Sequence, residues 1–310
     1  MTFLPKDFIE TTEGFLFAIV ASGLETGKVR CFLRYVRNEH GRWRKVQTDE
    51  ANDLLMRHHF DYCFHSSELD AFLHAVSLSR IIKHHRPQYR LTQLLANSSR
   101  DEVENDCINL CLLFEQNGID LNQFGVTGSL LINQQKMSSD IDLVCYDTTV
   151  FHQCRAVLRH LIEHKKLADL NHDDWIESYE RRDCDLSFES YVWHERRKAN
   201  KALINGRKFD LSLVVPHEPD SITYQKYGAM TLCTKVKDDT RAFSYPAEFK
   251  LTHPTIQSVV CFTATYVGQA IAGETIEISG QLEQDAKGNQ RLVVGSTREA
   301  RGEYIKVIRE

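Results

Sequence analysis

A short stretch in the middle of the chain constrains its fold more than any other feature. The segment FGVTGS at 124–129 ends in a Gly-Ser pair, and after ten intervening residues the segment DIDLV begins at position 140. Alternate residues of a β-strand point to the same face of the sheet. Asp140 and Asp142 would therefore project together, while the apolar residues beside them turn toward the core.

This spacing predicts a site for a metal ion and a nucleotide. Two carboxylates about 7 Å apart along a strand can hold a hard divalent cation such as Mg²⁺ between them. The small turn at Gly128 and Ser129 leaves room for a triphosphate to approach the backbone. We place Ser139, directly before the acidic pair, in the same phosphate-binding set. The combination indicates phosphoryl or nucleotidyl transfer.

The pattern resembles the signature of the polymerase beta-like nucleotidyltransferase superfamily, which has a Gly-Ser turn, a spacer of about this length and then Asp-x-Asp. That superfamily carries a third acidic residue on a later strand, and Asp210 within the apolar segment Lys208–Val215 fits this description. More widely, the chain resembles uncharacterised predicted nucleotidyltransferases of archaeal type through its segments Asp7–Thr11 and Trp193–Lys198.

The resemblance implies an α+β fold with a mixed-sheet catalytic domain, and a two-metal mechanism. Asp140 and Asp142 would bridge two Mg²⁺ or Mn²⁺ ions, and Asp210 would bind the ion nearer the nucleophile and help to accept its proton. The implied reaction transfers a nucleoside monophosphate from a nucleoside triphosphate such as ATP to a hydroxyl acceptor.

The third carboxylate has a rival in the sequence. Asp183 and Asp185 also flank apolar residues, but they lie in a stretch rich in arginine and glutamate that reads as helix or loop. The apolar run around Asp210 is typical of a buried strand. We therefore favour Asp210.

The densest group of cations near these motifs is Arg196, Arg197 and Lys198. Phosphoryl transfer benefits from cations that offset the charge developing on the phosphates, so we include these three as candidate phosphate-binding residues. A solvated helix face explains such a run of charges equally well.

Histidines offer a second metal hypothesis. His58, His59, Cys63 and His65 lie within eight residues and resemble part of a ligand set. No second Cys or His pair follows at the spacing of a zinc site. Structural roles for these histidines are the favoured interpretation.

Composition limits the remaining classes. The chain has 310 residues, enough for two or three domains. No apolar run is long enough to cross a bilayer, and the first residues lack the pattern of a secretory signal. The nine cysteines form no paired spacing and fit free thiols in a reducing compartment. We expect a cytoplasmic protein without a membrane partner.

The pattern along the chain predicts three domains, at 1–97, 98–242 and 243–310. The first should be an α+β domain with strands over 15–22 and 29–36, a helix from Thr48, helical stretches over 67–75 and 79–85, and a stop at Pro87. The second is the catalytic domain, with helices that begin at Ser99 and span 150–166 and 179–202.

The third domain is predicted to be all β. Strands are expected over 259–267, 275–283, 290–294 and 303–308. Four or five strands in so short a segment suggest a small barrel, with the oligonucleotide-binding (OB) type as a candidate.

Two functions of different class follow. The first is a magnesium-dependent nucleotidyltransferase whose acceptor could be RNA or DNA, with protein or small-molecule hydroxyls open as well. The second is a non-catalytic nucleic-acid-binding or regulatory protein on the same scaffold. The net charge is +3 over residues 1–100, −7 over 101–242 and −1 over 243–310, so no segment is basic enough for charge alone to argue for nucleic acid. The sequence leaves the oligomeric state and the preferred nucleotide open.

Overall fold

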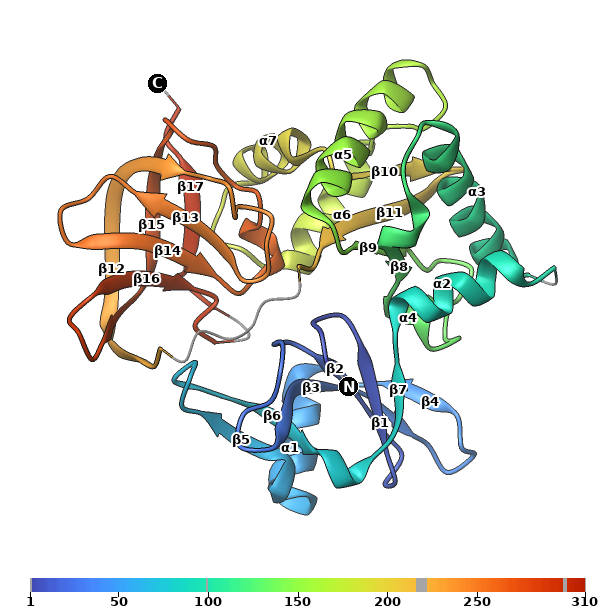
Figure 1. Cartoon of the computed structure of the whole chain (residues 1–310), viewed down its shortest axis with the longest axis horizontal. Helices are drawn as coiled ribbons and strands as arrows, with labels where there is room; N and C mark the ends of the chain where they lie inside the picture. The colour runs from blue at the N-terminus through green and yellow to red at the C-terminus, as the bar shows by residue number, and fades with distance from the viewer. Residues whose placement is uncertain (1, 99, 216–221, 298–299, 310) are drawn as a thin grey trace. The chain divides into compact units, whose positions relative to one another are not determined.

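The structure is a computed structural model that describes residues 2–98, 100–215, 222–297 and 300–309 (Figure 1). The chain divides into two compact units, each assembled from three stretches of sequence. Unit 1 consists of Met1–Ser66, Phe72–Ala168 and Ala202–Asp220, and unit 2 consists of Ser67–Ala71, Asp169–Lys201 and Ser221–Glu310. Whether the segments 1–97, 98–242 and 243–310 fold as separate domains stays a prediction.

The N-terminal part of the chain forms a seven-stranded sheet in the order β5-β6-β3-β2-β1-β7, with β4 paired to β3. Its strands are β1 (Phe8–Thr11), β2 (Phe15–Ile19), β3 (Lys28–Arg37), β4 (Trp43–Lys45), β5 (Cys63–Ser66), β6 (Ala71–Ser77) and β7 (Ile81–His85). Helix α1 (Thr48–His58) buries Ala51 and Leu55 in the same core as β2 and β3. The expected strand over 29–36 and the helix from Thr48 are confirmed, and the strand expected over 15–22 is present but ends at Ile19.

The helices expected over 67–75 and 79–85 are wrong, because strands β6 and β7 occupy these positions. Strand β6 pairs with β3 and β7 pairs with β1, both far away in the sequence. Pro87 does not stop a helix but begins helix α2 (Pro87–Ala96). The first residue of a helix needs no backbone N–H partner, so proline is well suited to it.

The rest of unit 1 is built on a four-stranded sheet in the order β10-β11-β9-β8. Its strands are β8 (Phe124–Val126), β9 (Ile141–Cys145), β10 (Lys201–Ile204) and β11 (Arg207–Leu213), and its helices are α3 (Glu102–Gln116), α4 (Gly128–Leu131) and α5 (Thr148–Glu163). Asp101 caps α3 in a capping box with Glu104, and Asp147 caps α5. Ser99, the expected start of α3, lies outside the described residues.

The two sheets of unit 1 share apolar contacts. Phe8 and Leu16 of the N-terminal sheet form one buried cluster with Leu131 and Ile132 at the end of α4. Because α4 contains the Gly-Ser pair, the N-terminal sheet packs directly behind that motif.

The stretch 169–201 of unit 2 interrupts unit 1 in sequence, and the chain closes tightly around this interruption. Ala168 and Leu203 form an isolated antiparallel bridge, with hydrogen bonds of 3.0 and 2.8 Å between their backbone groups. The interrupting stretch contains helix α6 (His172–Arg182) and helix α7 (Phe188–Lys198). The single helical segment expected over 179–202 is thus two helices and the start of β10.

Unit 2 also contains a six-stranded sheet in the order β12-β13-β14-β16-β15-β17, with an additional pairing between β12 and β15. Its strands are β12 (Tyr224–Asp238), β13 (Ala247–Leu251), β14 (Ile256–Cys261), β15 (Thr275–Asp285), β16 (Gln290–Val294) and β17 (Tyr304–Val307). Strand β12, which the sequence analysis left in the catalytic segment, pairs with β13 and β15. The strands expected over 275–283, 290–294 and 303–308 are confirmed as β15, β16 and β17. The strand expected over 259–267 is wrong beyond Cys261, because β14 ends there and a 3-10 helix follows at Ala264–Tyr266.

The chain therefore has the expected α+β class, with several sheets and helices distributed between them. Short 3-10 helices complete the fold at Phe60–Tyr62, Leu78–Arg80, Leu121–Gln123 and Ala264–Tyr266. In the part of the chain that is described, no helix has the length and apolar character needed to span a membrane.

Candidate active site

Strands β9 and β11 place two aspartates side by side. They are neighbours in the sheet (Figure 1). They run parallel, and their register pairs Asp142 with Asp210. Neighbouring strands lie about 4.8 Å apart, so both carboxylates leave the same face of the sheet. The flanking residues Ile141 and Leu211 are completely buried on the opposite face.

Asp140 directly precedes β9 and stands two residues before Asp142. All three aspartates are partly exposed, as residues that meet a ligand must be. The face that the sequence pattern assigned to metal binding is therefore the accessible face of this sheet.

Gly128 lies against the carboxylate of Asp142. Its φ is +65°, and a Cβ atom added there would come within 2.3 Å of Oδ2 of Asp142. Only glycine permits both this conformation and this close approach. The backbone N–H of Thr127 donates to the backbone carbonyl of Asp142 at 2.9 Å. The Gly-Ser turn and the acidic strand thus form one local structure.

The two candidate phosphate-binding serines have different surroundings. Ser129 lies in α4, is partly exposed, and its hydroxyl makes no hydrogen bond within the described residues. The hydroxyl of Ser139 accepts the backbone N–H of Lys136 at 2.9 Å. Ser139 already stabilises its own loop, and its role in phosphate binding stays a prediction.

Arg207 is a residue that sequence reasoning missed. Its Nε donates to Asp106 of α3 at 2.7 Å, and its Nη1 donates to the carbonyls of Met137 at 2.6 Å and Ser139 at 3.0 Å. These contacts fix the loop that leads into Asp140. These partners lie 68 to 101 positions away in sequence, so no local sequence pattern could have predicted the contacts.

The turn before β1 supplies a second missed residue, Lys6. The hydroxyl of Thr127 donates to the carbonyl of Lys6 at 2.6 Å, which holds Lys6 beside the Gly-Ser turn. Lys6 has a φ of +76°, and this left-handed conformation is costly for a residue with a side chain. Within the described residues no partner is found for its partly exposed ammonium group.

A charge of the candidate site affects the pKa of an ionisable group in the N-terminal sheet. Burial raises the pKa of Tyr35 in β3, and the negative charge of Asp142 raises it further while Arg34 opposes both. Asp7 forms a largely buried pair with His84 at 2.8 Å. Burial raises the pKa of Asp7, against the opposing effect of His84. The site is therefore bordered by the N-terminal sheet as well as by β8, β9 and β11.

The three candidate cations of α7 belong to unit 2, where each has an acidic partner. Arg197 donates to Glu274 at 2.5 Å, and Arg196 lies 3.7 Å from Asp169. Lys198 is only 2 % exposed and donates to the carboxylate of Glu195 and, at 2.7 Å, to the carbonyl of Thr265.

These contacts give the α7 cations a structural explanation. Lys198 in particular is enclosed by protein groups, which leaves its ammonium little access to a ligand. Phosphate binding by Arg196, Arg197 and Lys198 stays a prediction.

The rival carboxylates are engaged elsewhere in unit 2. Asp183 ends α6 in a left-handed conformation, and Asp185 accepts the backbone N–H of Gly302 at 2.7 Å. Since Asp210 pairs in register with Asp142, it is the better third carboxylate.

The histidine-rich segment at 58–65 gathers no metal-ligand group. The ring of His59 packs edge-on against Phe15, and that of His65 packs against Phe72. Among the residues that the structure describes, His160 and Glu163 of α5 and His164 directly after it have ligand atoms within 4.8 Å of one another.

Comparison with known proteins gives one informative relative. The chain is 33 % identical over 338 aligned positions to an uncharacterized protein, MJ1086, of the archaeon Methanocaldococcus jannaschii, and the alignment covers 98 % of each chain. No protein-family model matches the chain. No solved structure matches it either.

Proposed function

Because the chain belongs to the same protein family as MJ1086 of Methanocaldococcus jannaschii, whose name states no activity, we propose its function from the site itself. We propose that the protein is a Mg²⁺-dependent nucleotidyltransferase, which moves a nucleoside monophosphate from a nucleoside triphosphate to a hydroxyl acceptor. The observation that carries this proposal is the in-register pair of Asp142 and Asp210 beside the turn at Gly128.

The donor set fits the proposed metal. Partly exposed carboxylate oxygens from neighbouring strands are the ligands that Mg²⁺ prefers. Asp140 and Asp142 would hold two ions, and Asp210 the ion nearer the acceptor. Bound Mg²⁺ would lower the pKa of the attacking hydroxyl and offset charge on the leaving pyrophosphate. Asp210, at the edge of this set, is suited to receive the hydroxyl proton.

The phosphates would lie against the Gly-Ser turn, with the hydroxyl of Ser129 as a hydrogen-bond donor. Lys6 is the cation best suited to join them, because Thr127 holds its backbone at that turn and its ammonium has no partner among the described residues. The cost of its left-handed conformation supports a functional reason for its position. Lys6 would offset charge on the β- and γ-phosphates.

The acceptor we favour is a nucleic acid. The pairings of unit 2 run from β12 through β13, β14, β16 and β15 and return to β12, which supports a small five-stranded barrel of the OB type. Such barrels bind single strands through exposed aromatic side chains, and Tyr227 on β12 is 61 % exposed. Tyr266, in contrast, is buried.

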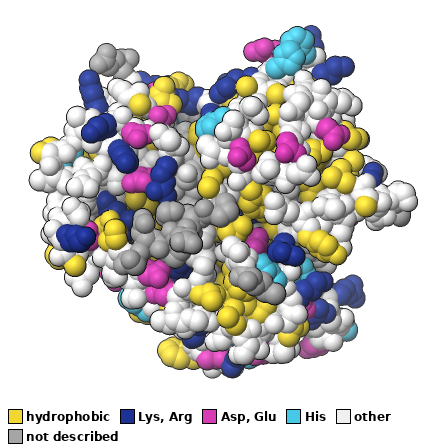
Figure 2. Space-filling model, viewed as in Figure 1, with side chains coloured by type: hydrophobic (Ala, Val, Ile, Leu, Met, Phe, Trp, Pro, Cys, Tyr) yellow, Lys and Arg dark blue, Asp and Glu magenta, His cyan; other side chains and the backbone are white. Residues whose placement is uncertain are grey.

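Positive charge would contribute little to acceptor binding. Figure 2 shows basic and acidic side chains interspersed on the face in view. A salt-insensitive affinity, which depends more on stacking than on phosphate contacts, is therefore expected.

The test is transfer of label from each of the four ribonucleoside triphosphates, with Mg²⁺ or Mn²⁺, to a mixed RNA acceptor. The wild type should incorporate label, and Asp142→Ala should not. Asp173→Ala, an exposed aspartate on α6, is the matched control and should behave as wild type. Equal incorporation by wild type and Asp142→Ala would refute the catalytic proposal.

The contribution of Lys6 is tested by nucleotide binding rather than turnover. Lys6→Ala should weaken Mg²⁺-dependent binding of a fluorescent triphosphate about tenfold, the effect expected for one charge-assisted contact. Lys6→Arg should restore part of it. Wild-type binding with no loss in Lys6→Ala would remove Lys6 from the site and leave the carboxylates in place.

A further inference from the structure

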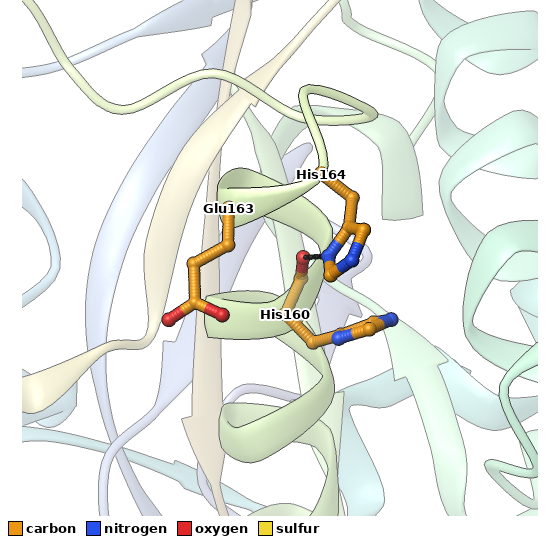
Figure 3. Close-up of side chains that lie close together, drawn as sticks. All are labelled: His160, Glu163 and His164. Atoms are coloured by element: carbon orange, nitrogen blue, oxygen red, sulfur yellow. Dashed lines mark hydrogen bonds between the residues drawn. The ribbon is translucent and has the colours of Figure 1, made fainter.

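The last turn of helix α5 carries three side chains with metal-binding atoms close together. His160, Glu163 and His164 each offer one ligand atom, and these atoms all lie within 4.8 Å of one another (Figure 3). All three residues are exposed. Residues three and four positions apart are neighbours on a helix surface, so the helix itself brings the two imidazoles and the carboxylate together.

The ring of His164 is held in one tautomer. Its Nδ1 lies 2.9 Å from the backbone carbonyl of His160 (Figure 3). A carbonyl oxygen can only accept, so Nδ1 carries the proton and Nε2 keeps its lone pair. Histidines that bind metals typically donate their second ring nitrogen in this way, which orients the ring.

The two rings are also placed together. The ring centroids of His160 and His164 are 4.0 Å apart. The backbone below them is fixed, because the N–H of His164 donates to His160 at 3.0 Å and the N–H of Lys166 donates to Leu161 at 2.9 Å. Since the backbone is already ordered, binding an ion would require only side-chain rotation.

The position on the helix favours a cation. α5 ends at Glu163, and the carbonyl end of a helix carries a partial negative charge. Glu163 adds a full negative charge of its own. Two positively charged neighbours, Lys165 and Lys166, repel a cation. The affinity for a metal ion must therefore come from direct bonds to the ligand atoms rather than from the local electrostatic potential.

We propose that His160, Glu163 and His164 form a binding site for one transition-metal ion of the kind that imidazole selects, with Zn²⁺ as the probe. The Zn–N distance is about 2.0–2.1 Å, and modest rotation would bring the ligand atoms onto one ion. Water would complete the coordination. Three protein ligands with an open position differ from structural zinc sites, which are closed by four protein ligands.

This site differs in chemistry from the one proposed for Mg²⁺. Asp140, Asp142 and Asp210 offer only hard oxygen ligands, whereas imidazole nitrogen prefers Zn²⁺, Cu²⁺ or Ni²⁺. The proposal therefore stands on different residues and does not depend on the nucleotidyltransferase function.

The test is calorimetric titration of the full chain, stripped with a chelator, with Zn²⁺ in the presence of excess Mg²⁺. Wild type should bind one Zn²⁺ that Mg²⁺ does not displace. His164→Ala and His160→Ala should each weaken binding at least about tenfold, and the double variant should lose the site. Glu163→Gln should have a smaller effect. His40→Ala, an exposed histidine in another turn, is the matched control.

Nine cysteines could bind zinc elsewhere, so the ligand type needs its own readout. The Co²⁺ complex of the wild type should lack the intense near-ultraviolet band of thiolate ligands. No Zn²⁺ binding by the wild type, unchanged affinity in the double variant, or a thiolate band that survives in the double variant would each overturn the proposal.

Discussion

The sequence analysis assigned charged residues of two regions to one site, namely the face of strands β9 and β11 and the helix α7. The two regions differ in how far these charges are buried and in how they are paired. On the sheet face, Asp142 and Asp210 stand side by side, partly exposed, next to a glycine that leaves room. On α7, Glu195 and Lys198 are buried and form an ion pair with each other.

The difference shows how a functional charge can be told from a structural one. Burial alone would raise the pKa of Glu195, but Lys198 and Lys201 hold it far below its usual range. A buried charge must be compensated in this way, because desolvation is costly. Partly exposed carboxylates on a sheet face carry no such requirement, and the Mg²⁺ ions that we propose would give their clustering a function.

The largest expected effect is on catalysis, from Asp210→Asn. Losing one metal ligand should reduce Mg²⁺-dependent transfer by about 10²–10³-fold, while the midpoint of thermal unfolding stays close to that of the wild type. Initial rates and a melting curve on the same preparation measure both. If Asp185→Asn lost activity and Asp210→Asn kept it, Asp185 rather than Asp210 would be the third carboxylate.

The next effect is on stability, from Lys198→Met. This change leaves Glu195 buried with one partner fewer, and unfolding in urea should show a loss of about 3–5 kcal/mol. Arg196→Ala is the control, because Arg196 forms only an exposed ion pair with Asp169, with 3.7 Å between Nε and Oδ2. It should change the free energy of unfolding by less than about 0.5 kcal/mol. A Lys198 variant that folds normally but binds nucleotide poorly would make α7 part of the site.

A pH dependence should follow from His194 of α7. Its Nδ1 donates to Ser190 at 2.7 Å and its Nε2 accepts the N–H of Val307 at 3.1 Å, so it is bound as the neutral ring. Burial lowers its pKa to about 4. The unfolded chain binds this proton near pH 6.5, so stability should decrease as pH falls from about 6.5 to about 4, by up to about 3 kcal/mol.

The control for this prediction is His194→Gln, measured by chemical unfolding at several pH values. The variant should be less stable at pH 7 but should show a shallower decrease toward pH 4. Parallel curves for the two proteins would assign the pH dependence to other groups.

The smallest expected effect on stability comes from Gly128→Ala, about 1–2 kcal/mol for a left-handed residue with a Cβ. Gly206→Ala is a close match, since its φ is +78° and nothing lies within 4 Å of the added Cβ. Both variants should lose similar stability. Only Gly128→Ala should also lose transfer activity, because its Cβ would displace the carboxylate of Asp142. Equal transfer activity in the two variants would show that the turn at Gly128 does not contribute to the site.

Local periodicity explains which parts of this fold could be predicted. Strands β9 and β11 were predictable because their apolar residues alternate with aspartates over a few positions. Strands β6 and β7 were mistaken for helices because their pairing with β3 and β1 is non-local. Strand β12 was missed for a related reason, since much of it is exposed and its partners follow later in the chain.

The missed site residues have the same cause. Arg207 donates to Asp106, 101 positions away, and the carbonyl of Lys6 accepts from Thr127, 121 positions away. Spacing within one segment cannot encode such contacts. The pairing of Lys198 with Glu195 was visible in sequence, three residues apart, but its burial was not.

The bridge between Ala168 and Leu203 has a practical consequence for engineering. It joins the two ends of the interruption by backbone hydrogen bonds alone, so excising 170–201 and splicing a tight turn in its place should leave the register of β9 with β11 intact. A foreign helical hairpin could also be inserted at this bridge in place of the natural segment.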